Sequence, residues 1–143
     1  MKTLMPTQIP LAERKWYIID AKGQTLGRLA TKVATLISGK SRLDFSPHMD
    51  NGDYVIVLNT KQVFVTGKKE EQKLYRTHSG YMGGLKETSL GKLRSDRPNA
   101  IIEHAISGML PKNRLRDGMM NRLKLVDGEA HDYASQKLET ITL

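Results

Sequence analysis

The sequence predicts an α/β fold, a single compact domain in which helices pack on a small, mainly parallel sheet. Two short apolar segments, residues 16–19 and 54–58, have the aromatic and β-branched composition of strands that are covered on both faces. Between them lies a segment whose apolar residues recur at helical spacing. This strand–helix–strand order predicts a right-handed parallel unit, and a chain of 143 residues is long enough to bury one core around it.

The first strand, residues 16–19, ends at Asp20, and turn residues around Gly23 follow it. Thr25 is a candidate N-cap, because its hydroxyl can accept a hydrogen bond from a free backbone N–H of the first turn. Ser38 and Gly39 supply the stop signal of the helix. The helix itself is indicated by apolar residues three and four apart, namely Leu26, Leu29, Ala30, Val33, Ala34 and Ile37.

Weaker patterns follow the second strand, which the turn signal Asn51-Gly52 precedes. Residues 63–65 predict a short strand that closes at Thr66 and Gly67. Residues 73–78 can extend as another strand before a glycine-rich segment, residues 79–84.

A second helix is predicted to begin at Pro98, which suits a first turn, and to end before Pro111. A shorter helix follows, in which Gly118 costs about 1 kcal/mol relative to alanine. The pattern that indicates this shorter helix is an apolar spacing formed by Leu115, Met119 and Leu123.

We expect residues 1–143 to form one domain, with no internal repeat or linker. Residues 1–14 are predicted to be a loosely ordered N-terminal extension, and residues 125–143 a locally acidic C-terminal tail.

Composition excludes several classes of protein. Hydrophobic residues make up 38% and charged residues 27%, which fits neither a disordered nor a low-complexity chain. The longest aliphatic run, residues 55–58, is far short of the roughly 20 apolar residues of a spanning helix. Pro6 and Pro10 interrupt any signal-peptide core, so we expect neither a membrane protein nor a secreted one. The absence of cysteine excludes disulfides and cysteine-ligated metals and is compatible with a reducing, cytoplasm-like compartment.

The charge of the chain points to a polyanionic partner. The formal net charge is +8 and the isoelectric point about 9.8. Residues 61–124 carry 14 basic and 6 acidic side chains, against 8 and 5 in residues 1–60 and 1 and 4 in residues 125–143. This asymmetry favours a nucleic-acid-binding face over evenly spread solubilising charge.

An enzyme is the alternative from another class. The turn at Gly23 and the helix that opens at Thr25 have the arrangement that can hold a phosphate, but neither the dinucleotide fingerprint nor the Walker spacing is present. His48, Asp50 and Asp53 resemble a metal site, yet the acids are equally explained as turn formers beside Asn51-Gly52. We therefore expect no catalytic residue, no metal and no cofactor.

The nucleic-acid pattern is stronger, and it falls in two clusters. The first interleaves basic residues with flat rings that can stack on unpaired bases, and consists of Lys68, Lys69, Lys73, Tyr75, Arg76, His78, Tyr81 and Lys86. The second is basic and suits phosphate recognition, and consists of Lys112, Arg114, Arg116, Arg122 and Lys124. Lys40 and Arg42 are further candidates. A solvated hairpin with half-buried tyrosines stays open as the other interpretation of the first cluster.

From about residue 15 to residue 136, the chain resembles the bacterial-type large-subunit ribosomal protein thirteen family. The motifs that carry the resemblance are Trp16-Tyr-Ile-Ile-Asp20, Thr25-Leu-Gly-Arg-Leu-Ala30, Pro47-His48 with Gly52-Asp-Tyr-Val55, Val65-Thr-Gly-Lys68, Lys73-Leu-Tyr75 with His78-Ser-Gly80, Gly83-Gly84, and Gly108-Met-Leu-Pro-Lys112. Two segments depart from the family pattern. Leu115-Arg116-Asp117 stands where the family has Leu-Gly-Arg, and His131-Asp132-Tyr133-Ala134 stands where it has His-x-His-x-Ala.

The resemblance implies a three-layer α/β/α sandwich around a parallel sheet and a non-catalytic role. It implies that the protein binds large-subunit rRNA during early assembly, beside neighbouring large-subunit ribosomal proteins, with no membrane and no small-molecule substrate. Its location would be the cytoplasmic ribosome, or the ribosome of an organelle of bacterial descent. The alternatives are a small nucleotide-binding α/β enzyme and a free RNA-binding regulator.

Overall fold

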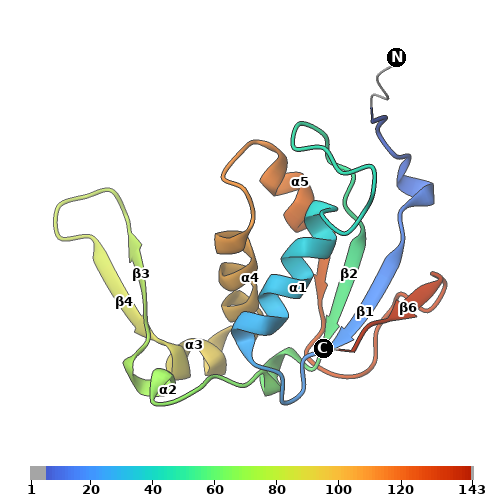
Figure 1. Ribbon diagram of the computed structural model, residues 1–143. Coiled ribbons are helices and arrows are strands. Elements are labelled where there is room, and N and C mark those ends of the chain that lie inside the picture. The colour runs from blue at the N-terminus through green and yellow to red at the C-terminus, as the bar shows by residue number, and fades with distance from the viewer. Residues whose placement is uncertain (1–5, 143) are drawn as a thin grey trace.

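The computed structural model describes residues 6–142 and contains a four-stranded sheet (Figure 1). The strands stand in the order β5-β2-β1-β6 and every pairing is parallel. Their bounds are β1 (Trp16–Asp20), β2 (Tyr54–Leu58), β5 (Leu123–Leu125) and β6 (Leu138–Thr140). The predicted class, α/β with a mainly parallel sheet, is confirmed, and so are the two central strands. Strands β5 and β6 were not predicted, because three residues are too few to show a strand pattern.

Helix α1 (Leu26–Ser38) connects the two central strands. It ends as predicted, because Gly39 adopts a left-handed conformation with φ 79° and its N–H bonds to carbonyls of the last turn. Its start differs from the prediction. Thr25 has the extended backbone of an N-cap, but its hydroxyl makes no capping hydrogen bond. The N–H of Leu26 donates instead to the carbonyl of Phe64 at 2.9 Å, so a distant segment satisfies the first turn of the helix.

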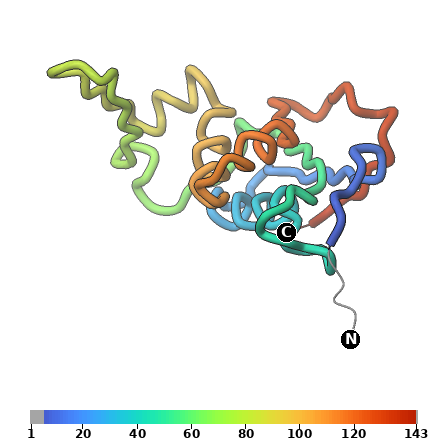
Figure 2. The backbone as a smooth tube through the Cα atoms, turned by 90° about the horizontal axis from the view of Figure 1, so that it is seen from above, coloured from blue at the N-terminus to red at the C-terminus, as the bar shows by residue number. Residues whose placement is uncertain are grey.

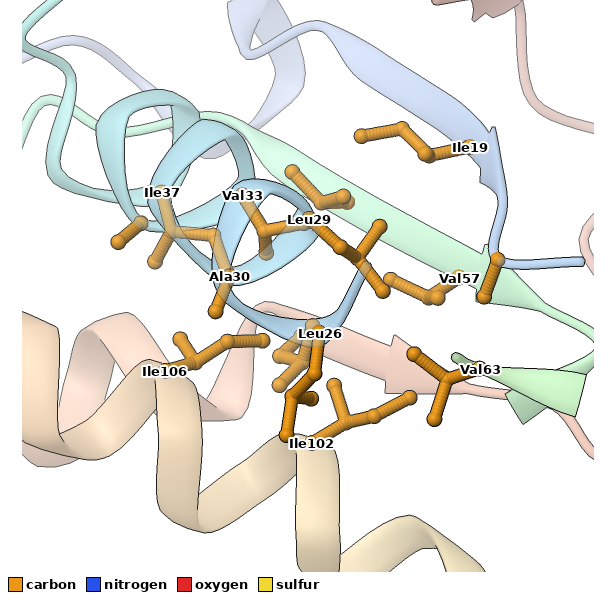
Figure 3. Close-up of a cluster of buried hydrophobic side chains, with 14 of the residues drawn as sticks. Ile19, Leu26, Leu29, Ala30, Val33, Ile37, Val57, Val63, Ile102 and Ile106 are labelled. Atoms are coloured by element: carbon orange, nitrogen blue, oxygen red, sulfur yellow. The ribbon is translucent and has the colours of Figure 1, made fainter. Parts of the chain in front are cut away.

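Four further α-helices follow β2 in the described chain. They are α2 (Lys69–Gln72), α3 (Leu90–Asp96), α4 (Pro98–Met109) and α5 (Leu115–Asn121). Helix α4 confirms the predicted one, and α5 confirms the shorter helix except at Leu123, which lies in β5 because the helix ends at Asn121. Helices α2 and α3 were not predicted. Ile102 and Ile106 of α4 face α1 across a core in which Leu29, Val33 and Ile37 are fully buried (Figure 3). Between residues 6 and 142, no helix is long and apolar enough to cross a membrane.

The sheet face opposite α1 is covered differently from what the resemblance implies. Trp16 and Tyr54 are paired in register and stack with ring centroids 4.2 Å apart. Because side chains alternate along a strand, these rings point away from Val55 in the core. Tyr133, in the segment that joins β5 to β6, packs against Trp16, with the two ring centroids 5.7 Å apart.

That segment, residues 126–137, contains no helix. The expected α/β/α layering is therefore corrected, since irregular chain forms the layer opposite α1. The segment is rich in acidic and turn-forming residues and has no apolar stripe at helical spacing, which explains why it does not fold as a helix.

The strand predicted at residues 63–65 is wrong. Phe64 makes a single parallel bridge to Thr25, and a 3-10 helix, Thr60–Gln62, comes just before it. The ladder stops there because α1 begins at Leu26, which removes the partner strand. Val63 is nevertheless buried in the core.

The N-terminal segment is more tightly held than the predicted loose extension, of which residues 1–5 lie outside the described residues. The side chain of Asn51 accepts a hydrogen bond from the N–H of Ile9 at 3.1 Å and donates to the carbonyl of Thr7 at 3.0 Å. Arg14 is buried and donates to the carbonyls of Asp50 and Gly52. A short 3-10 helix, Leu11–Glu13, lies between these anchors.

A hairpin projects from the body of the molecule (Figures 1 and 2). Its strands are β3 (Leu74–His78) and β4 (Leu85–Ser89), paired antiparallel. Its base contacts α2 and α3. The predicted strand at residues 73–78 is confirmed, and its pairing with β4 agrees with the hairpin interpretation. That interpretation had half-buried tyrosines, which holds for Tyr75 but not for the exposed Tyr81.

Candidate nucleic-acid interface

The projecting hairpin exposes nearly all of its side chains. Only its base, at Tyr75, Thr88 and Ser89, is partly covered. At the tip, Gly80 and Gly83 have φ of 88° and 71°, conformations that glycine adopts without strain. The two residues between them, Tyr81 and Met82, are fully presented to solvent, with Tyr81 80% exposed. A two-stranded hairpin is marginally stable alone in water, so this arm is suited to docking on a partner.

The candidate contacts on the hairpin divide between its two faces. Arg76 and His78 share one face, and Lys86 lies on the other, as the register with their cross-strand partners requires. Arg76 forms an exposed ion pair with Glu87 at 2.6 Å, a contact that solvent screening makes easy to exchange for a phosphate. The Nδ1 atom of His78 accepts a hydrogen bond from the N–H of Gly80, which holds the ring at the start of the tip.

Tyr75 does not present a free ring, and its predicted role as a stacking surface is corrected. Its ring packs against the hydrophobic core, 5.5 Å from the ring of His104, and Lys73 Nζ lies 5.2 Å from its centroid. Burial raises the pKa of its hydroxyl, and the positive charge of Arg94 only partly opposes this shift. Tyr75 therefore anchors the hairpin to the body.

Helix α2, at the base of the hairpin, exposes Lys69 and is flanked by the exposed Lys68 and Lys73. Helix α2 contains two acidic residues, Glu70 and Glu71, and Glu70 is held by Arg94. Glu70 and Arg94 form a bidentate pair with distances of 2.7 and 3.2 Å. One of the two negative charges of α2 is thus neutralised within the fold, whereas Glu71 is exposed and forms no ion pair among residues 6–142.

The second cluster is split by the structure. Lys112 and Arg114 are exposed in the turn between α4 and α5, and Arg116 and Lys124 are half-buried. Among residues 6–142, none of these four side chains forms an ion pair.

Arg122, the fifth member of that cluster, is buried, and its predicted contact with phosphate is corrected. Its guanidinium donates to both carboxylate oxygens of Asp50 at 2.5 Å. It also donates to the carbonyls of Gly118 and Ile37. Its side chain is 6% exposed, so no phosphate can reach it. The arginine instead ties α5 and the end of α1 to the loop before β2.

The candidates near the end of α1 differ from each other. Lys40 is exposed, whereas Arg42 is half-buried and pairs with Asp44 at 3.0 Å and Asp53 at 3.1 Å. The hydrogen bond to Asp44 raises the pKa of Arg42, and the charge of Asp53 adds to the effect. Arg42 is therefore occupied by carboxylates. Over the described residues, no group of three or more histidine, cysteine, aspartate or glutamate side chains is arranged to hold a metal ion.

Two exposed basic residues that the sequence analysis did not select lie on the outer face of α1. Arg28 and Lys32 are one helical turn apart, and α1 contains no acidic residue. The signal was present in the sequence as a helix whose polar face is purely basic. It was overlooked because two charges in a mostly apolar segment do not form a visible cluster.

The structure thus places exposed basic side chains on a projecting hairpin, beside a body built on a parallel sheet (Figure 1). The comparisons with known proteins give the family. Residues 14–132 match the family described as Ribosomal protein L13. The chain therefore belongs to the ribosomal protein L13 family, a family of structural proteins without enzymatic activity, and the resemblance seen in the sequence is confirmed.

Bacterial relatives match almost the whole chain. The large ribosomal subunit protein uL13 of Synechocystis is 51% identical over 142 residues, which cover 99% of this chain and 93% of the relative. The protein of the same name from Clostridioides difficile is 50% identical over 129 residues, or 90% of each chain. That of Agathobacter rectalis is 49% identical over 141 residues, or 99% of each chain.

Proposed function

We propose that the protein is a structural constituent of the large ribosomal subunit that binds large-subunit rRNA and supports early assembly of the subunit. The observation that carries this proposal is the projecting hairpin, whose exposed tip presents Tyr81 between glycines. Around its base lie exposed lysines that form no ion pair with residues 6–142. The family membership of the chain gives the partner, because the relatives bear the name of a large-subunit protein.

The proposed contacts are the exposed or half-exposed members of the predicted set. Basic side chains would neutralise phosphates, Tyr81 would stack on an unpaired base, and base-specific readout would contribute little. Arg42, Tyr75 and Arg122 are left out because the fold engages them internally. The proposed rRNA-binding residues are Lys40, Lys68, Lys69, Lys73, Arg76, His78, Tyr81, Lys86, Lys112, Arg114, Arg116 and Lys124.

Neighbouring large-subunit proteins are further proposed partners. The protein would reside where those ribosomes assemble, which is the cytoplasm in a bacterium. A free RNA-binding regulator with the same basic surface is the alternative that has to be separated from this proposal.

Co-sedimentation tests the proposal. A tagged copy of the full chain is expressed in a bacterium, and lysates are separated on sucrose gradients after a high-salt wash. We expect the tag to stay with large subunits, because many simultaneous phosphate contacts resist salt together. A protein that remains at the top of the gradient, or that leaves the particle completely in the wash, would support the free regulator instead.

A further inference from the structure

The outer face of α1 forms the floor of a continuous groove. Three adjoining hollows run along this helix, which lies beside α4 in Figure 1. The first hollow lies beside Phe64, the second beside Arg28 and Lys32, and the third beside Lys40. The first and second hollows share Thr25, Gly27 and Lys69, and the second and third share Thr31 and Thr35. We call this feature the α1 groove. The 13 residues of α1 span about 20 Å, enough for several nucleotides of an extended strand.

The charge of the α1 groove has one sign. Five basic side chains line its hollows, and no acidic side chain does: Arg28, Lys32, Lys40, Lys69 and Lys73. None of the five forms an ion pair with any residue between 6 and 142. Elsewhere in the fold, arginines such as Arg94 and Arg122 are matched by carboxylates. The groove is therefore suited to bind an anion from outside the chain.

The floor of the groove lets a chain approach closely and offers acceptors to it. Gly27 has no side chain, and Thr31 and Thr35 have short ones. The hydroxyls of both threonines donate to carbonyls one turn earlier, each at 2.9 Å, so their oxygen lone pairs remain free to accept. A ribose 2′-hydroxyl is a donor of the required kind, and it recurs at every nucleotide of an RNA strand.

The groove also carries an exposed aromatic ring. Phe64 lines its first hollow and is 52% exposed, and Met109 beside it is 46% exposed. A positively charged groove with an exposed ring is the arrangement that holds single-stranded nucleic acid, since phosphates follow the cations and a base stacks on the ring.

We propose that the α1 groove holds the sugar–phosphate backbone of a single RNA strand. Arg28 and Lys32, whose Cβ atoms lie about 5–6 Å apart by helix geometry, contact successive phosphates, and Phe64 stacks on a base. The inference rests on the proposed function, because the strand would be a segment of large-subunit rRNA. One end of the groove lies at Lys69 and Lys73 of the first basic cluster, and the other lies at Lys40 and at Pro111, which precedes Lys112 of the second cluster in the chain.

Salt-dependent binding tests the phosphate contacts. The full chain is titrated with a labelled poly(U) RNA oligonucleotide across a salt series, and the double variant Arg28→Gln/Lys32→Gln is compared with Lys22→Gln/Lys92→Gln. The control pair is exposed, forms no ion pair in the described chain and lines none of the hollows, yet it removes the same charge. Loss of two phosphate contacts with a single strand should lower the slope of log K against log salt by about 1.4. Between 50 and 200 mM salt, the affinity of the groove variant should then fall about 7-fold less than that of the wild type.

Further arms separate the remaining outcomes. Phe64→Ala should weaken binding about tenfold at every salt concentration without changing the slope, as expected for a lost stacking surface. A photo-crosslinking residue in place of Thr35 should label rRNA in purified large subunits, whereas one in place of Lys92 should not. Circular dichroism establishes that each variant is folded.

Equal slopes for the groove and control pairs, or a crosslink from position 35 to a protein, would overturn this inference while leaving the proposed function intact. Failure of the wild type both to bind RNA and to co-sediment with large subunits would overturn the two together.

Discussion

Replacing Arg122 by glutamine should destabilise the fold and leave RNA binding unchanged, although the residue belongs by sequence to the second basic cluster. The substitution removes all the hydrogen bonds that the guanidinium donates to Asp50, Gly118 and Ile37. It also leaves the Asp50 carboxylate, which is 17% exposed, without its closest cation.

The magnitude follows from the burial of the pair. Removing one partner of a buried ion pair costs about 3–5 kcal/mol, and the partial exposure of Asp50 favours the lower end, about 3 kcal/mol. The unfolding entropy of about 2.1 cal/mol/K per residue gives about 0.3 kcal/mol/K for 143 residues. The melting temperature should therefore fall by about 10 °C.

Arg114→Gln is the matched control, because Arg114 is exposed and unpaired in the described chain. It should change the free energy of unfolding by less than about 0.5 kcal/mol and lower the salt slope of rRNA binding by about 0.7 to 0.9. Thermal unfolding followed by circular dichroism, and titration of an rRNA transcript at several salt concentrations, measure the two quantities for both variants.

The reasoning fails if Arg122→Gln melts within about 2 °C of the wild type, since a shift of that size corresponds to well under 1 kcal/mol in a chain of this length. A reduced salt slope in a folded Arg122→Gln variant would likewise mean that the guanidinium reaches phosphate.

Three further predictions concern the fold and the hairpin. A Cβ at Gly52 would overlap the carbonyl oxygen of Ile37, so Gly52→Ala should destabilise the protein by several kcal/mol in a denaturant titration, and a wild-type midpoint would contradict the close approach. Hydrogen bonds from the Asn59 amide and then from a backbone N–H lower the pKa of Asp20, so its stabilisation is present above its unfolded pKa of 3.8 and is lost as the pH falls through the lower folded value. The difference in stability between wild type and Asp20→Ala should thus be constant near neutrality and shrink in acid below about pH 4, and a difference independent of pH would refute this. Tyr81→Ala should weaken rRNA binding about 5- to 150-fold with an unchanged salt slope, because an exposed stacking surface is lost. Tyr75→Phe removes a buried hydroxyl that has no partner among the described residues, so it should leave binding unchanged and raise the free energy of unfolding by about 1 kcal/mol. Titration and melting of both variants check this, and the reverse ranking would contradict it.

Local patterns predicted the β1–α1–β2 unit and the family. The apolar runs of β1 and β2, the periodicity of α1 and the left-handed glycine at its end depend on neighbours within a few residues of one another. The single bridge at Phe64, in place of the predicted strand, could not be predicted in the same way. The number of residues that pair there depends on where α1, about forty residues earlier in the chain, begins.

For the candidate interface too, the sequence predicted some properties of the residues and the tertiary contacts decided others. The sequence determined that residues 61–124 are basic and that rings lie among the charges. It did not distinguish Arg114 from Arg122, or Tyr81 from Tyr75. Asp50, which is 72 residues from Arg122 in the chain, removes that arginine from the surface, and packing against the core removes Tyr75. Charge and ring content are properties of the residue itself, whereas exposure and pairing are properties of contacts between distant segments, and only the tertiary structure brings those segments together.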